Sequence, residues 1–221
     1  MMTSRGTAVQ VAGEELWLFP ERAAYWEGRR TLIVADLHVG KAAAFRAGGV
    51  PLPPGSTKAD LDRLSSILHE TDAGRLLILG DLYHAREGMA PETLAGLRAW
   101  RRTHAGLEVR VVRGNHDRKA GPSPQDLDFR EAEEPLLEGP FVFRHDPAES
   151  EGGYVLCGHV HPAAVMTGRG LRPLRVPCFC FGSSIGMLPA FGSFTGTARV
   201  RPKKSERVFV IAGTEVVEAR R

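Results

Sequence analysis

Short apolar runs alternate with amphipathic segments along much of this chain. Five runs rich in branched residues have the length and composition of buried β-strands, and they cover residues 31–35, 75–79, 109–113, 141–144 and 154–157. Two segments between them carry apolar side chains three and four positions apart, as one face of a helix does. These are Leu61, Leu64 and Leu68 within 57–69, and Leu94, Leu97 and Trp100 within 91–103. Strands that alternate with helices predict an α/β sheet.

Signals at the helix starts agree with these two helices. Thr57 and Asp60 are spaced as in a capping box, in which each residue satisfies a free backbone N–H at the start of the helix. Pro91 suits a first helical turn, where the missing N–H of proline costs nothing.

The end of the chain has a different pattern. Residues 205–212 and 215–218 predict a β-hairpin, and the glycine-rich stretch 182–196 before them predicts mostly loop. Neither a fixed-period repeat nor a flexible linker interrupts the chain. We therefore expect one domain over residues 1–221.

The composition is that of a globular protein. The chain has 221 residues, 43% of them hydrophobic and 25% charged, which excludes disordered, collagen-like and coiled-coil classes for the whole chain. The apolar runs are far shorter than the ~20 residues of a membrane span, and the N-terminus lacks the apolar core of a secretory signal. Three cysteines, an odd number, suit a reducing compartment. We expect a cytoplasmic protein with no membrane partner, and its oligomeric state stays open.

The net charge of +3 is compatible with an anionic substrate and too small to identify a nucleic-acid partner. Two basic clusters either follow a nucleic-acid backbone or form ordinary solvated faces. They are Arg98, Arg101 and Arg102 on a predicted helix, and Arg199, Arg201, Lys203 and Lys204 before the hairpin.

Metal-binding residue types follow each of the five predicted strands. In order, the segments are Asp36-Leu37-His38, Gly80-Asp81, Gly114-Asn115-His116-Asp117, His145 and Gly158-His159-Val160-His161. The carboxyl ends of strands in an α/β sheet form the crevice where ligands bind, so we expect these side chains to converge. Each motif alone is also compatible with a turn, since Asp and Asn are common there. Together they predict a site for two divalent cations, and the preceding glycines allow sharp turns.

The three cysteines offer a second metal hypothesis, a zinc site. However, Cys178 and Cys180 lie two apart on a strand-like segment and therefore point the same way. Free cysteine is among the most buried residue types. We expect these two side chains and Cys157 to belong to the core.

The five motifs resemble those of the calcineurin-like metallophosphoesterase superfamily over residues 31–161. A closer likeness, to the bacterial ligase-associated DNA damage response endonuclease family known as PdeM, covers most of the chain. It rests on ADLHVGKAAAFRAGGVPLPPG, GDLYHAR, VRGNHDR, FRHDP, GHVHP, PCFCFG and LPAFGSFTG. The resemblance implies a four-layer αββα sandwich of two mixed sheets flanked by helices. It also implies DNA as substrate and DNA-repair proteins such as a DNA ligase as partners.

The resemblance also implies a ligand set for two metal ions. Asp36, His38 and His161 would hold one ion, Asn115, His145 and His159 the other, and Asp81 would bridge them. A mixed nitrogen and oxygen set without thiolate favours Mn²⁺, with Fe²⁺ or Zn²⁺ as alternatives. Such a pair of ions activates a water molecule as the nucleophile.

Other residues are expected to act on the substrate. We predict that His116 donates a proton to the leaving oxygen and that Asp117 orients its ring. Lys41 either reaches a substrate phosphate or begins a solvated turn. The phosphoprotein-phosphatase branch has G-D-x-x-D-R, whereas this chain has His84 at the second Asp position and Arg86 one residue late. A protein phosphatase is thereby disfavoured, although His84 and Arg86 remain candidates for substrate contact.

Three functions are compatible with these motifs. The first is a dinuclear phosphodiesterase that acts on DNA during repair. The second is a nucleotide or nucleotide-sugar pyrophosphohydrolase, because the metal site alone does not choose between the two. The third is a non-catalytic scaffold, which predicts damaged ligand positions, whereas every motif position here is filled.

Overall fold

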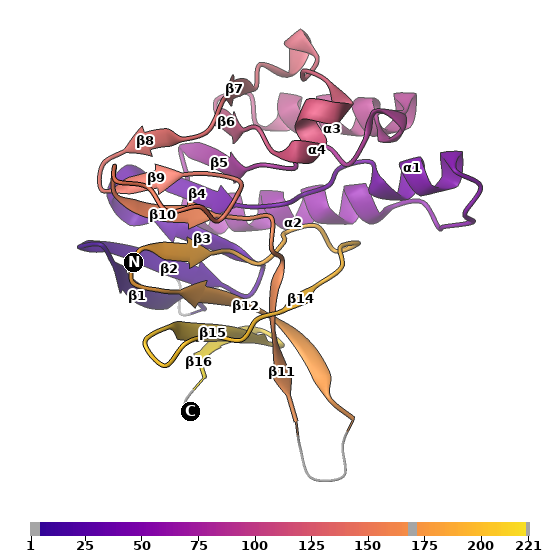
Figure 1. Ribbon diagram of the computed structural model, residues 1–221. Coiled ribbons are helices and arrows are strands. Elements are labelled where there is room, and N and C mark those ends of the chain that lie inside the picture. The colour runs from indigo at the N-terminus through magenta and orange to yellow at the C-terminus, as the bar shows by residue number, and fades with distance from the viewer. Residues whose placement is uncertain (1–4, 168–171, 220–221) are drawn as a thin grey trace.

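The computed structural model describes residues 5–167 and 172–219 (Figure 1). Its first sheet has seven strands in the order of the chain. They are β1 (Thr7–Val11), β2 (Glu14–Phe19), β3 (Ala23–Trp26), β4 (Thr31–Val34), β5 (Arg75–Leu79), β6 (Glu108–Val112) and β7 (Arg130–Ala132). Strands β1 to β4 pair antiparallel, and β4 to β7 pair parallel.

The second sheet has nine strands, in the order β14-β11-β12-β13-β10-β9-β8 with β15 and β16 joined to β12. They are β8 (Leu136–Glu138), β9 (Phe141–Phe143), β10 (Tyr154–Cys157), β11 (Pro162–Met166), β12 (Leu174–Phe181), β13 (Ile185–Met187), β14 (Ala198–Arg199), β15 (Arg207–Ala212) and β16 (Glu215–Glu218). Both parallel and antiparallel pairs occur in this sheet. The predicted α/β fold of two mixed sheets with flanking helices is confirmed.

Four α-helices connect strands of the first sheet. They are α1 (Lys41–Ala47), α2 (Ser56–Thr71), α3 (Pro91–Thr103) and α4 (Asn115–Ala120), and three 3-10 turns add η1 (Glu27–Arg29), η2 (Arg86–Gly88) and η3 (Gln125–Leu127). The prediction for 91–103 matches α3, and α2 contains the predicted 57–69. No helix among the described residues combines the length and apolarity that crossing a membrane requires.

The capping box predicted for α2 is wrong. The helix is capped by Gly55 in the left-handed conformation, with no side-chain cap. The Asp60 carboxylate is buried and accepts hydrogen bonds from the backbone N–H of Ser193, at 3.1 Å. It also pairs with Arg63 at 2.9 Å. A long-range contact therefore takes the carboxylate that the local pattern assigned to the helix start.

The central strands are buried on both faces, which explains why they are apolar throughout. In β4, Leu32 and Val34 pack into the core beneath α2 and α3, whereas Ile33, and Ala35 directly after the strand, face the second sheet. The same alternation holds in β5 and β6. Because β4, β5 and β6 are adjacent and parallel, right-handed connections put α2 and α3 on one face of the sheet.

The second sheet packs against the inner face of the first. Phe141, Phe179 and Phe209 bring aromatic rings into the layer between the sheets. The predicted hairpin is confirmed as β15 and β16, and the stretch 182–196 is loop apart from β13. The three cysteines are buried thiols that pack in the core of this half of the fold, as expected.

Strands β11 and β12 form a hairpin that projects from the rest of the molecule (Figure 1). The short strand β14 pairs with the base of β11. This hairpin begins at Pro162, directly after the last of the metal-ligand candidates.

Candidate metal centre

The structure brings the ligand candidates together at the carboxyl ends of β4, β5, β6, β9 and β10. Five of them adopt left-handed backbone conformations, with φ between 48° and 66°; they are Asp36, His38, Asp81, His159 and His161. For a residue with a side chain this conformation costs about 1–2 kcal/mol, and such strain is concentrated at functional sites. The sequence analysis did not foresee it, because no local signal marks a non-glycine residue for this conformation.

One cluster contains Asp36, His38 and His161, whose ligand atoms all lie within 4.8 Å of one another. His161 Nε2 lies 3.4 Å from His38 Nε2 and 3.5 Å from Asp36 Oδ1. Asp36 is fully buried and accepts a hydrogen bond from the backbone N–H of His159 at 2.9 Å. These three residues are those that the sequence assigned to the first ion.

A second cluster contains Asp81, His145 and His159, again within 4.8 Å. His145 Nε2 lies 3.0 Å from His159 Nδ1 and 2.9 Å from Asn115 Oδ1. The four side chains come from β5, β6, β9 and β10, so both sheets contribute. They are the residues assigned to the second ion.

Asp81 lies between the two clusters. Its Oδ2 is 3.8 Å from His38 Nε2, and its Oδ1 is 3.5 Å from His145 Nε2. One carboxylate thus presents one oxygen to each cluster. This is the arrangement that a shared ligand needs.

Backbone carbonyls fix the protonation of two ring nitrogens. Nδ1 of His145 donates to the carbonyl of Leu79 at 3.1 Å, and Nδ1 of His161 donates to the carbonyl of Gly196 at 3.1 Å. In each neutral ring, Nε2 then presents a lone pair toward the cluster. The nitrogens of His38 and His161 approach within 3.4 Å, and those of His145 and His159 within 3.0 Å, beside buried carboxylates. Imidazole nitrogen and carboxylate oxygen atoms gathered in this way form a donor set that fits divalent metal ions.

The electrostatics of the site agree with that fit. Burial, with the positive charge of Lys41, lowers the pKa of His38 to about 2, so this ring stays neutral and free to bind a cation. Burial raises the pKa of Asp81, and the neighbouring His145 opposes that rise. Burial disfavours the charged form of His161, but the hydrogen bond and charge of Asp36 outweigh it and raise the pKa.

Close packing explains the glycines that precede the ligands. A Cβ on Gly80 would overlap the ring of His145, and one on Gly158 would lie 2.6 Å from Asp36 Oδ2. Of the glycines before Asp81, Asn115 and His159, only Gly80 has a positive φ, +78°. At Gly114 and Gly158 the space beside Asp81 and Asp36, rather than a left-handed backbone, requires a glycine.

His116 faces the centre from the start of α4. Its backbone N–H donates to Asp81 Oδ1 at 2.9 Å, and its Nε2 lies 4.0 Å from Asp81 Oδ2. Its Nδ1 donates to the carbonyl of His84 at 2.5 Å, and the two rings stack with centroids 4.9 Å apart. Nδ1 of this ring is therefore held by the backbone, and Nε2 lies beside the carboxylate of Asp81.

Asp117 does not orient the ring of His116, and that prediction is wrong. Its carboxylate is buried and accepts hydrogen bonds from the backbone N–H groups of Tyr83 and Gly114, each at 2.9 Å. Burial raises its pKa. Asp117 instead holds the loop after β5 against the start of α4, and the carbonyl of His84 orients His116.

The three substrate-binding candidates differ in position. Lys41 is half-buried at the start of α1, a helix rather than the solvated turn considered above, and burial lowers its pKa while Asp81 opposes this. His84 lies 3.5 Å from His38 between Nδ1 atoms, and burial lowers its pKa to about 4. Arg86 is exposed on η2 and makes no ion pair with any described residue.

An exposed aromatic pair borders the site and was missed by sequence reasoning. Phe45 on α1 stacks on His84, with centroids 5.9 Å apart, and meets Phe194 edge to face at 5.9 Å. Their exposed fractions, 38% and 40%, are large for phenylalanine. Only the tertiary structure brings the two rings together.

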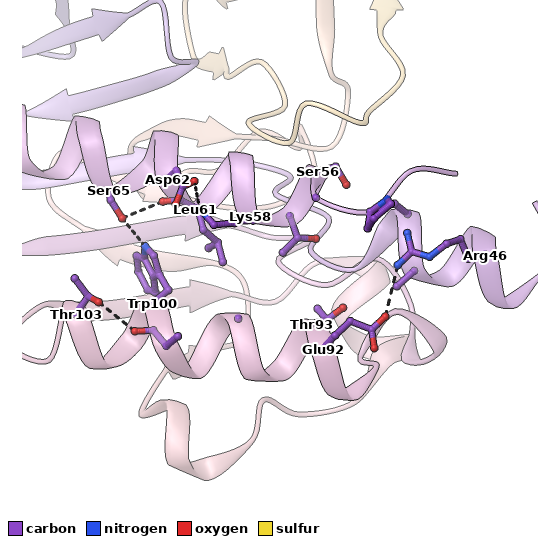
Figure 2. A pocket seen from close by; sticks show the side chains of 17 residues that line it. Arg46, Ser56, Lys58, Leu61, Asp62, Ser65, Glu92, Thr93, Trp100 and Thr103 are labelled. Carbon is purple, nitrogen blue, oxygen red and sulfur yellow. Dashed lines mark hydrogen bonds and ion pairs between the residues drawn. The ribbon is translucent and has the colours of Figure 1, made fainter. Parts of the chain in front are cut away.

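A separate cavity of about 520 Å³ lies between α1, α2 and α3. Figure 2 shows Arg46 and Glu92 paired at one end and Ser65 bonded to Trp100 at the other. None of the predicted site residues lines it. The chemistry of the metal centre is therefore not inside this cavity.

Comparisons relate the chain to known proteins. A family model described as calcineurin-like phosphoesterase matches residues 29–178. Among solved structures, the Pseudomonas putida nuclease MPE is 40% identical and aligns with a TM-score of 0.87 over 97% of this chain and 100% of that one. YfcE, a phosphoesterase from E. coli, is 16% identical, with a TM-score of 0.41 over 86% and 97% of the two chains. No curated protein matches.

Proposed function

This chain belongs to the calcineurin-like phosphoesterase family and is a metal-dependent phosphoric-ester hydrolase, and on that premise we propose that it is a dinuclear phosphodiesterase that cleaves DNA. The observation that carries this proposal is the position of Asp81, with one oxygen toward each cluster. The similarity to a nuclease at 40% identity supports a phosphodiester as the bond that is cleaved.

In this proposal each cluster would hold one divalent ion. Asp36, His38 and His161 would hold the first, Asn115, His145 and His159 would hold the second, and Asp81 would be a ligand of both. Bound divalent ions lower the pKa of a water molecule to about 7 and neutralise charge on phosphoryl oxygens. Mn²⁺ is the ion that we propose, because the donor set mixes imidazole, carboxylate and amide oxygen.

His116 protonates the leaving oxygen. With Nδ1 donating to the carbonyl of His84, the charged ring carries its second proton on Nε2, the atom that faces the centre. That proton passes to the departing alkoxide, so no strongly basic group is released.

Positive and aromatic groups receive the rest of the substrate. Lys41 supplies a half-buried ammonium beside Asp81 that attracts a phosphate. Phe45 and Phe194 offer exposed ring faces to a base next to the scissile bond. His84 connects the exposed aromatic pair to the proposed proton donor, because its ring stacks on Phe45 and on His116.

Metal analysis and a substrate panel test the proposal. We expect the purified chain with Mn²⁺ to hydrolyse a chromogenic phosphodiester and a DNA oligonucleotide, and to leave a phosphomonoester intact. Asp81→Asn should lose both ions and this activity. Cleavage of a nucleotide pyrophosphate without cleavage of DNA would favour a pyrophosphohydrolase, and no hydrolysis of any substrate would favour a scaffold.

We also propose that the enzyme acts in cytoplasmic DNA repair beside a DNA ligase, which rests on the resemblance of its motifs to the ligase-associated family. Deletion of the gene is expected to reduce survival after DNA damage. Unchanged survival would contradict the repair role and leave the hydrolytic activity as it stands.

A further inference from the structure

Positive charge is segregated in one part of this fold. From residue 152 to residue 205 the sequence contains no aspartate or glutamate, although the chain has 26 acidic residues. This stretch forms β10 to β14, including the projecting hairpin of β11 and β12. Among its described residues, four arginines are exposed, and together they are called the basic arm here: Arg172, Arg175, Arg199 and Arg201.

The basic arm differs from the arginines elsewhere on the surface. Arg98 pairs with Asp126 at 2.5 Å and Arg130 with Glu108 at 3.5 Å, as do many other arginines with nearby carboxylates. No arginine of the basic arm forms an ion pair with any residue that the structure describes. An anion can therefore bind to these guanidinium groups without breaking an existing ion pair. Because the like charges of the four arginines repel one another, binding of one polyanion to several of them is favoured.

Hydrogen bonds tie the basic arm to the metal centre. The backbone N–H of Ala198, the residue before Arg199, donates to the carbonyl of His161 at 2.9 Å. Arg175 Nη1 donates to the carbonyl of Thr197 at 3.3 Å. Strand β14 then runs parallel to β11 away from His161, with Arg199 opposite Ala163. In Figure 1 strand β11 leads outward from the body of the fold.

We infer that the basic arm is an exosite that binds the sugar-phosphate backbone of a nucleic-acid strand whose scissile bond lies at the metal centre. The inference rests on the proposed function and adds a second binding surface to it. Guanidinium groups bind phosphate through paired N–H donors. The five residues of β11 extend about 16 Å, the length of about five phosphates at the ~3.4 Å axial spacing of a duplex strand.

The exosite predicts that long and short substrates respond differently to the same substitutions. A small chromogenic diester such as bis(p-nitrophenyl) phosphate fills only the metal centre, whereas an oligonucleotide also reaches the arm. Loss of arm arginines should therefore raise KM for the oligonucleotide and leave both kinetic constants for the small diester unchanged.

Two double variants test this, Arg199→Gln with Arg201→Gln and Arg172→Gln with Arg175→Gln. Binding of a fluorescein-labelled oligonucleotide is followed by anisotropy in EDTA, where nothing is cleaved, and cleavage is followed with Mn²⁺. For each pair we expect binding to weaken about tenfold or more at ~0.1 M salt. The slope of log K against log salt should become shallower by about 2, roughly one per phosphate contact.

Matched controls separate a binding surface from net charge and from folding. Arg98→Gln with Arg130→Gln removes the same charge from surface arginines that are paired with carboxylates, and it should leave oligonucleotide binding within about twofold. Arg199→Lys with Arg201→Lys keeps the charge and should retain most of the binding.

An equal loss in the control pair, or unchanged oligonucleotide binding in both arm pairs, would overturn the exosite. So would a parallel loss on the small diester, which would show damage to the metal centre. If the wild-type chain binds the oligonucleotide through the arm but hydrolyses neither substrate, the exosite stands and the proposed function fails.

Discussion

Replacing His116 with alanine removes the proposed proton donor and leaves the proposed metal ligands in place. The ring contributes Nε2 near Asp81, while the contact to Asp81 Oδ1 comes from the backbone N–H and survives the substitution. His116 is not a member of the two clusters assigned to metal ions, although its ring nitrogen lies within 4.8 Å of ring nitrogens of His38 and His84. We therefore expect both ions to stay bound while proton donation is lost.

The expected magnitude follows from general acid catalysis. Loss of a positioned proton donor costs about 10² to 10⁴ in rate, which is about 3 to 5 kcal/mol of transition-state stabilisation. The full loss should appear in kcat for a DNA oligonucleotide, whose leaving alkoxide needs a proton. It should be much smaller for bis(p-nitrophenyl) phosphate, because nitrophenolate leaves without one.

The assay compares both substrates for His116→Ala and measures bound metal by mass spectrometry. His69→Ala, an exposed histidine in the last turn of α2, serves as the control and should behave as wild type. Equal losses on the two substrates, wild-type turnover of DNA, or loss of metal from His116→Ala would each refute the role of proton donor.

Three further predictions follow from the packing of the site. Gly80→Ala should lose metal and activity together, because its Cβ would overlap the ring of His145 and its φ is +78°; normal metal content measured by mass spectrometry would contradict this. Chelation should lower Tm, since each ion at 100 times its Kd stabilises the fold by about 2.7 kcal/mol; an unchanged Tm in calorimetry with EDTA would count against two structural ions. Phe45→Ala with Phe194→Ala should raise KM for an oligonucleotide about 5- to 150-fold at constant kcat, because stacking of a base on an aromatic ring contributes about 1–3 kcal/mol; an unchanged KM in steady-state kinetics would exclude stacking.

Part of the fold was predictable because its signals are local. The central strands are apolar on both faces, and α2 and α3 carry their core side chains on one stripe. Strands β1 to β3 were not predicted, since the alternation in β1 and β2 is short and mixed with polar residues, and the four residues of β3 are all buried and do not alternate. Their place is set by pairing with β4, a contact between segments that the local pattern does not reveal.

The metal-ligand candidates were predictable from their order after the strands, whereas the roles of two acidic residues were not. Asp60 and Asp117 each match a plausible local role, at a helix start and beside a histidine. The structure assigns both to hydrogen bonds with backbone N–H groups of distant loops, at Ser193 and at Tyr83. A buried carboxylate is stabilised by the donors that packing brings to it, whatever its sequence neighbours are.

The sequence by itself determined which residue types stand at the end of each apolar strand, and hence the chemistry that this chain offers. The tertiary structure alone decided that Asp81 faces both clusters and that backbone carbonyls of Leu79 and Gly196 accept hydrogen bonds from two of the histidine rings. It also decided that the strand carrying Arg199 is hydrogen-bonded to His161. The physical reason is the sequence separation of the groups that interact. Side-chain periodicity depends on a few neighbouring residues. The orientation of a histidine ring and the partner of a charge depend on groups that only the packing of the two sheets brings within a few ångströms.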